Sequence, residues 1–162
     1  MRSAAHALCQ LVVAALLSLG RPAFASHYAV GDVPHLITPA DAEKLHKAGV
    51  NTTEDLLAKA GKTKDRKSLA KASGLSAGTL LDLARRCDLL RIKGVGSEMV
   101  LLLEAAGVKS IAELAKKDAP GLLASMTAAN SAKKITEKPP TEPQVQYWID
   151  EAKKLPVVLE TK

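Results

Sequence analysis

Aromatic residues are scarce in this sequence of 162 residues, which contains two tyrosines, one tryptophan and one phenylalanine. Proteins that bind single-stranded nucleic acids stack the bases on aromatic side chains. The scarcity of aromatic rings therefore argues against binding of single-stranded nucleic acids by base stacking. We expect Tyr147 and Trp148 to complete a hydrophobic core near the C-terminal end instead.

Cysteine and histidine are also rare, with two and four residues respectively. Cys87 follows Leu80, Leu83 and Ala84 at helical spacing, which predicts a small buried side chain in place of a reactive thiol. The histidines lack the spacing and the cysteine partners of a zinc site. No nucleophile lies in an elbow motif, and no glycine-rich loop follows a strand pattern. We therefore expect no metal, no cofactor and no catalytic residues, and predict that the protein is not an enzyme.

The first 25 residues have the pattern of a secretory signal peptide. Met1 and Arg2 give a positive start, residues 8–19 form an apolar run, and Ala23-Phe24-Ala25 supplies a cleavage pattern. The apolar run is shorter than the ~20 residues that a membrane-spanning helix needs. We predict an exported protein, periplasmic or secreted, that is cleaved after Ala25 and has no membrane span in its mature part. Cleavage would leave one cysteine, hence no internal disulfide, and would remove two arginines from a formal net charge of +6.

Helix signals recur along the rest of the sequence, and no segment has the alternation of a strand. Polar capping residues precede apolar residues at helical spacing, and glycines follow them. These signals predict helices over residues 39–48, 53–60, 64–72, 77–87, 97–106 and 142–155, with two more that begin near residues 111 and 119. Short helices with short connections predict an all-α fold, a compact helical bundle.

The sequence also repeats itself. Residues 45–52 align with residues 103–110 at an offset of 58, and residues 76–90 align with residues 141–155. Each copy is expected to contain a hairpin of two helices and a second pair that packs back on it. The chain thus divides into a signal peptide (1–25), an N-terminal segment (26–34), a first helix-hairpin-helix-like unit (35–91), a second such unit (92–156) and a tail (157–162). Residues 131–141 are expected to form a solvated connection inside the second unit.

The stretch Asp88-Leu89-Leu90-Arg91-Ile92-Lys93-Gly94-Val95-Gly96, before the helix that begins at residue 97, fits a helix-hairpin-helix motif. Two glycines allow a tight turn at positive φ, Val95 between them is expected to pack inward, and N–H groups at a helix N-terminus can bind a phosphate oxygen. The same pattern also fits a tight turn that binds nothing. The candidate contacts with a nucleic-acid backbone are Gly94, Val95, Gly96, Arg91 and Lys93, with Arg85 and Arg86 nearby.

Two features count against DNA binding. Glu98, at the start of the following helix, repels phosphate. The corresponding hairpin of the first unit, Ile37-Thr38-Pro39-Ala40, has no glycine and lacks one donor at Pro39. A basic run over residues 62–71 fits a duplex contact, but such a run is more often the solvent face of a helix.

The chain from about residue 33 to residue 155 resembles the domain-of-unknown-function 4332 family, which is related to helix-hairpin-helix domains. The resemblance rests on residues 37–50, on the stretch 88–96, on residues 102–108 and on residues 143–153. It implies the tandem helical fold but supplies no activity, cofactor or catalytic residue. The kinship with helix-hairpin-helix proteins implies backbone-directed DNA binding through Gly94, Val95 and Gly96 by analogy of fold alone.

Two functions remain open at this point. The first is sequence-independent binding of double-stranded DNA outside the cytoplasm, which the second hairpin and the basic balance favour. The second is a protein-interaction or scaffold module of the cell envelope, which Glu98, the degenerate first hairpin and the predicted export favour. A positive patch that joins Arg91, Lys93 and residues 62–71 would support the first function, and an apolar surface patch would support the second.

Overall fold

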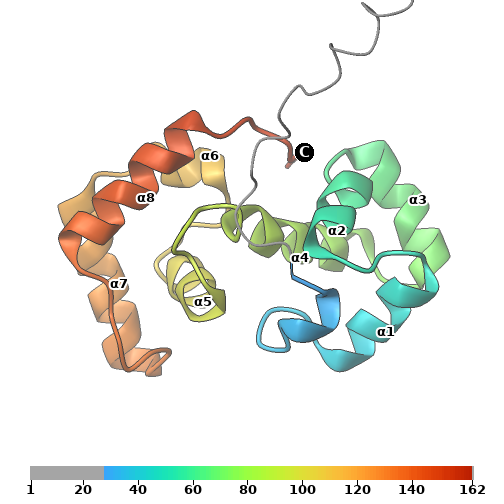
Figure 1. Ribbon diagram of the computed structural model, residues 1–162, viewed down its shortest axis with the longest axis horizontal. Coiled ribbons are helices and arrows are strands. Elements are labelled where there is room, and N and C mark those ends of the chain that lie inside the picture. Colours follow the sequence, from blue (N-terminus) through green and yellow to red (C-terminus); the bar gives the residue numbers. More distant parts are fainter. Residues whose placement is uncertain (1–27, 162) are drawn as a thin grey trace, which may run out of the picture.

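The computed structural model describes residues 28–161 of the chain, and these residues confirm the all-α prediction (Figure 1). The predicted signal peptide lies outside the described residues. Apart from one isolated bridge between Ala29 and Thr52, the described chain is built from helices and their connections. In order these are a 3-10 turn η1 (Val30–Asp32), α1 (Pro39–Lys47), α2 (Thr53–Ala60), α3 (Thr63–Ser73), α4 (Ala77–Leu89), α5 (Ser97–Ala105), α6 (Ile111–Leu114), α7 (Ala119–Lys133) and α8 (Glu142–Lys154).

Local capping explains where most of the helices begin. The Thr38 hydroxyl accepts a hydrogen bond from the Asp41 N–H at the start of α1, with Pro39 in the first helical position. Ser76 accepts from the Thr79 N–H at the start of α4. The remaining N-cap side chains that act in this way are Thr52, Ser110 and Asp118, while Thr141 and Gln144 form a capping box at α8. These bonds satisfy amides that have no partner inside the helix.

The internal repeat is visible in the helix boundaries. Helices α1 (39–47) and α5 (97–105) have the same bounds when the sequence is shifted by 58 residues. Helices α4 and α8 have the same bounds after a shift of 65 residues. Helix packing repeats as well, because α2 and α3 contact α4 as α6 and α7 contact α8. In Figure 1 the helices α1–α3 lie on one side of α4 and α5–α8 lie on the other. The boundary expected between residues 91 and 92 falls in the connection between α4 and α5.

One continuous core of buried hydrophobic side chains runs through both units. Leu45 and Leu103, which are equivalent in the repeat, are both fully buried. Trp148 is buried as predicted, but the prediction for Tyr147 is wrong, because 44% of that residue is exposed. The buried face of α8 is formed by Val145, Trp148, Ile149 and Ala152, which recur at helical spacing, and Tyr147 lies outside this face. No helix of residues 28–161 is long and apolar enough to cross a membrane.

The segment after α8 returns to the first unit. Its end lies beside α2 in Figure 1, where the Glu160 N–H donates to the Gly61 carbonyl oxygen at 2.8 Å. Leu159 is buried in the shared core. The residues that the sequence suggested as a tail therefore connect the two ends of the fold.

The Gly107→Ala substitution should lower the free energy of unfolding by about 1–2 kcal/mol, because Gly107 has a φ of +84° that an L side chain rarely adopts. A Cβ atom at this position would meet nothing within 4 Å, so the cost comes from the backbone alone. Gly31→Ala is the matched control, since the space there is equally open and its φ lies outside the left-handed region. Urea unfolding measures both, and equal stabilities of the two variants would contradict the expectation.

Candidate nucleic-acid interface at the second hairpin

The second hairpin, residues 90–96, connects α4 to α5. Gly94 has a φ of +87°, as the motif requires, and Ile92 and Val95 point into the core with 1% and 3% exposure. The predicted inward packing of Val95 is confirmed. Gly96 differs from the prediction, because its φ of −93° and ψ of −178° are extended values open to any residue. One glycine of the pair is therefore needed for the turn, and the other places a small residue at the start of α5.

The backbone amides of this hairpin differ in their availability. The Val95 N–H donates to the Ile92 carbonyl oxygen at 3.0 Å and closes the turn. Gly96 is the N-cap of α5 and offers no side chain to the amides of the first turn. Lys93 and Gly94 are exposed beside it. The accessible donors are thus the amides at the start of α5 together with the Lys93 ammonium group.

The guanidinium of Arg91 faces the interior of the protein. Its Nη1 atom donates to Asp88 Oδ1 at 2.7 Å and to the Pro156 carbonyl oxygen at 3.2 Å, and 9% of the side chain is exposed. Asp88 Oδ2 accepts from the Ile111 N–H at 3.2 Å, so the pair joins α4, α6 and the segment after α8. Burial raises the pKa of the Asp88 carboxyl, while the bonds from Arg91 and Ile111 oppose that rise. Arg91 is therefore a structural residue.

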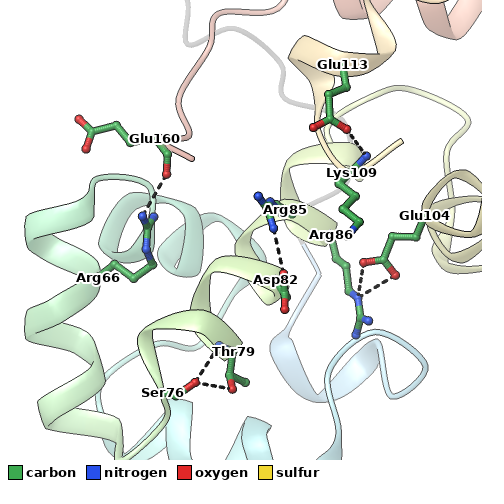
Figure 2. Close-up of polar contacts among 10 residues, drawn as sticks. All are labelled: Arg66, Ser76, Thr79, Asp82, Arg85, Arg86, Glu104, Lys109, Glu113 and Glu160. Atoms are coloured by element: carbon green, nitrogen blue, oxygen red, sulfur yellow. Dashed lines mark hydrogen bonds and ion pairs between the residues drawn. The ribbon is translucent and has the colours of Figure 1, made fainter. Parts of the chain in front are cut away.

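Arg85 and Arg86 also form ion pairs with residues of the same chain. Arg85 pairs with Asp82 at 3.1 Å. The Arg86 Nε atom lies 3.1 Å from both carboxylate oxygens of Glu104 (Figure 2). Its Nη1 atom donates to the Leu36 carbonyl oxygen at 2.8 Å. Arg86 thereby connects α4 to α5 and to the segment before α1. Of the basic residues suggested for the second hairpin, the structure leaves Lys93 facing solvent.

Glu98 has a partner that the sequence did not indicate. Its Oε2 atom accepts a hydrogen bond of 2.6 Å from the Thr136 hydroxyl, and Thr136 is 8% exposed. The connection between α7 and α8 is therefore attached to the first turn of α5. The Lys138 N–H donates to the same hydroxyl oxygen, which brings a lysine backbone next to this turn. The polar composition of residues 131–141 suggested a connection surrounded by solvent. No local sequence pattern indicates the contact between Thr136 and Glu98, which are 38 residues apart.

The basic run over residues 62–71 lies on α3 and on the residue before it. Lys62, Lys64, Lys67 and Lys71 are exposed, whereas Arg66 is 4% exposed. In Figure 1 α3 and α5 lie on opposite sides of α4. The lysines of the run thus form the solvent face of α3.

Cys87, the one cysteine of residues 28–161, is buried. Burial and the neighbouring Asp88 raise the pKa of the Cys87 thiol to about 12, so it stays protonated at neutral pH. Within residues 28–161, no group of three or more His, Cys, Asp or Glu side chains is placed to hold a metal ion.

An apolar groove with a volume of about 540 Å³ lies on the first unit. One wall is α2, where Leu57 and Ala58 line the groove, and the other wall is the segment after α8, with Val157 and Val158. These valines are 72% and 40% exposed. The groove lies near the pair formed by Asp88 and Arg91, since Arg91 contributes to its lining.

The family model for a domain of unknown function, DUF4332, matches residues 35–155. The chain therefore belongs to the DUF4332 family, as the sequence resemblance predicted. Comparison with curated proteins and with solved structures found no match.

Replacing Arg91 by leucine should lower the free energy of unfolding by about 3–5 kcal/mol, because the buried Asp88 carboxylate loses its countercharge. Without Arg91 the folded pKa of Asp88 lies further above its unfolded value. The loss in free energy of unfolding should therefore be smallest in acid. It should grow as the pH rises through the pKa of Asp88 in the folded state. Lys93→Ala, at an exposed position, should change stability by less than about 0.5 kcal/mol. Urea unfolding at several pH values tests both, and an unaffected Arg91→Leu variant would show that the pair is not structural.

Proposed function

We propose that the chain is a non-enzymatic binding module that grips the phosphate backbone of double-stranded DNA, independently of sequence, through the second hairpin. One observation carries the proposal. Among the eight α-helices of residues 28–161, α5 receives no side chain at its first amides, while each of the others does. A helix start with free amides attracts an anion by its hydrogen bonds and its dipole.

The residues around the start of α5 suit a phosphate oxygen. Gly96 leaves room, because a Cβ atom there would meet nothing within 4 Å. Lys93 is exposed in the same hairpin and supplies a positive charge. Glu98 opposes binding, but the Thr136 hydroxyl holds its carboxylate by a short hydrogen bond. The first hairpin lacks these properties, since Thr38 and Asp41 bond each other at the start of α1.

The pattern of the first 25 residues supports export, with cleavage after Ala25. The module would then meet DNA in the periplasm or outside the cell. A protein-interaction role in the cell envelope is the second candidate, and the apolar groove beside α2 favours it.

Gly96→Asp separates the two candidates, because the new carboxylate caps α5 from within. The fold should keep its stability or gain a few tenths of a kcal/mol. Binding of a labelled random duplex should weaken by about tenfold or more, since charge-assisted hydrogen bonds are lost and a negative charge is added. Fluorescence anisotropy at low and at physiological salt measures the affinity. With few phosphates contacted, the slope of log affinity against log salt should be about −1 to −2.

Gly31→Asp controls for the change in net charge, because Gly31 is exposed in η1, outside the hairpin, and its Cβ would meet no atom within 4 Å. Equal DNA binding by the two aspartate variants would mean that phosphate does not bind at α5. If the unmodified protein binds no duplex at low salt, the DNA proposal is wrong and the protein-interaction candidate takes its place.

Removing the charge of Glu98 should have the opposite effect. Glu98→Gln keeps a side chain that can accept from Thr136 and eliminates a carboxylate in the first turn of α5. The affinity for duplex DNA should rise by about two- to fivefold, which corresponds to the 0.3–1 kcal/mol typical of a charge at a helix end. Glu54→Gln, in the first turn of α2, is a matched control. An equal rise in both variants would point to net charge in place of a local site.

A further inference from the structure

Residues 156–161, here called the strap, cross from the end of α8 to the first unit and are held at both ends. At one end the Pro156 carbonyl oxygen accepts from Arg91 Nη1 at 3.2 Å. At the other end Leu159 is 7% exposed in the core, and the Glu160 N–H donates to the Gly61 carbonyl oxygen. The middle is loosely held, since Val157 is 72% exposed above the groove.

The outer anchor of the strap is a set of specific contacts with Glu160. The Thr63 N–H, at the start of α3, donates to the Glu160 carboxylate at 2.8 Å. Arg66 Nη2 donates to the Glu160 main-chain carbonyl oxygen at 3.0 Å (Figure 2). Hydrogen bonds from the amide and the side chain of Thr63 lower the pKa of Glu160, and the charges of Lys62 and Arg66 act in the same direction. This anchor recognises both the backbone and the carboxylate of one residue.

The two units differ at this position. The N-cap of α7 is Asp118, whose carboxylate accepts from the Gly121 N–H at 2.7 Å. The N-cap of α3 is Lys62, which makes no such bond, and the carboxylate of Glu160 occupies that place. Helix α3 therefore lacks a cap from its own N-cap residue and takes one from a segment 97 residues away.

Close approach of the strap depends on Gly61. A Cβ atom at this position would lie 2.7 Å from the Val158 carbonyl oxygen, which is backbone and has no freedom to turn aside. The first unit thus presents a narrow track for an extended backbone, with a buried place for Leu159 and a carboxylate site at the start of α3. Beside the track runs the apolar groove lined by Leu57 and Ala58.

We propose that this track is a peptide-docking site, which the strap occupies within the chain and which takes an extended segment of a partner protein with the same pattern, a large aliphatic residue followed by an acidic one. The strap itself defines the chemistry of the occupant. A partner can dock only after the strap has left the track. The apparent affinity for the partner is therefore the affinity of the empty track multiplied by the fraction of time that the track is empty. A tethered segment competes at an effective concentration of about millimolar. The site lies on a different unit from the second hairpin and goes beyond DNA binding.

The experiment uses a fluorescent peptide with the sequence of residues 155–162 and the protein from Ser26 onward, followed by anisotropy. Leu159→Ser in the protein should release the strap and bind the peptide at least about tenfold more tightly than the unchanged protein does. Glu160→Lys is a second release variant, which weakens the carboxylate anchor instead of the core contact. Circular dichroism confirms that each variant retains its helices.

A matched pair of receptor variants isolates the amide of Thr63. Thr63→Pro removes this N–H at the first position of α3, where proline is well accepted, and Lys62 before it has the extended φ and ψ of −91° and 142° that proline requires. Thr63→Ala removes the hydroxyl and keeps the N–H. In the Leu159→Ser background, Thr63→Pro should weaken peptide binding by about tenfold relative to Thr63→Ala.

Changes in the peptide complete the test. Serine in place of the leucine, or glutamine in place of the glutamate, should each weaken binding to the released protein. The proposal is overturned if neither folded release variant binds the peptide more tightly than the unchanged protein. It is equally overturned if binding is insensitive to Thr63→Pro and to both changes in the peptide.

Discussion

The buried ion pair between Asp88 and Arg91 holds the two units together. Removing two charges from water is expensive, and further hydrogen bonds to the two groups offset part of this cost. Here the carboxylate accepts from the Ile111 N–H at the start of α6, and the guanidinium donates to the Pro156 carbonyl oxygen. One pair therefore connects the end of α4, the second unit and the strap. The same geometry withdraws Arg91 from the surface and leaves Lys93 as the cation of the hairpin.

The two units share a helix pattern but differ in how their helix starts are capped. In the first unit α1 is capped by Thr38 and α3 by Glu160 of the strap. In the second unit α7 is capped by Asp118, and α5 receives no side chain. Each unit thus has one helix start that its own N-cap residue leaves open, at a different place in the repeat. The two copies keep a common core and have separate surfaces available for binding.

Short-range features could be predicted from the sequence, because both partners of each interaction lie within one turn. The caps at Thr38, Ser76 and Ser110, the positive φ of Gly94 and the burial of Val95 belong to this class. The features that decide the site join distant residues. Glu98 meets Thr136 across 38 residues, and Arg91 meets Pro156 across 65. A list of basic residues near a hairpin cannot show which of them form ion pairs within the chain, as Arg91 does with Asp88.

The strap bears on the question of what the start of α5 binds. At the start of α3, which has no cap of its own, the Glu160 carboxylate accepts a hydrogen bond of 2.8 Å from the first amide of the helix. The start of α5 has the same unmet amides, and within residues 28–161 no side chain fills them. An anion from outside the chain satisfies the same physical requirement as Glu160 does at α3. Because a single lysine accompanies these amides, directed hydrogen bonds contribute more to such binding than net charge does, which favours a local grip on phosphate over attraction of a duplex along a basic face.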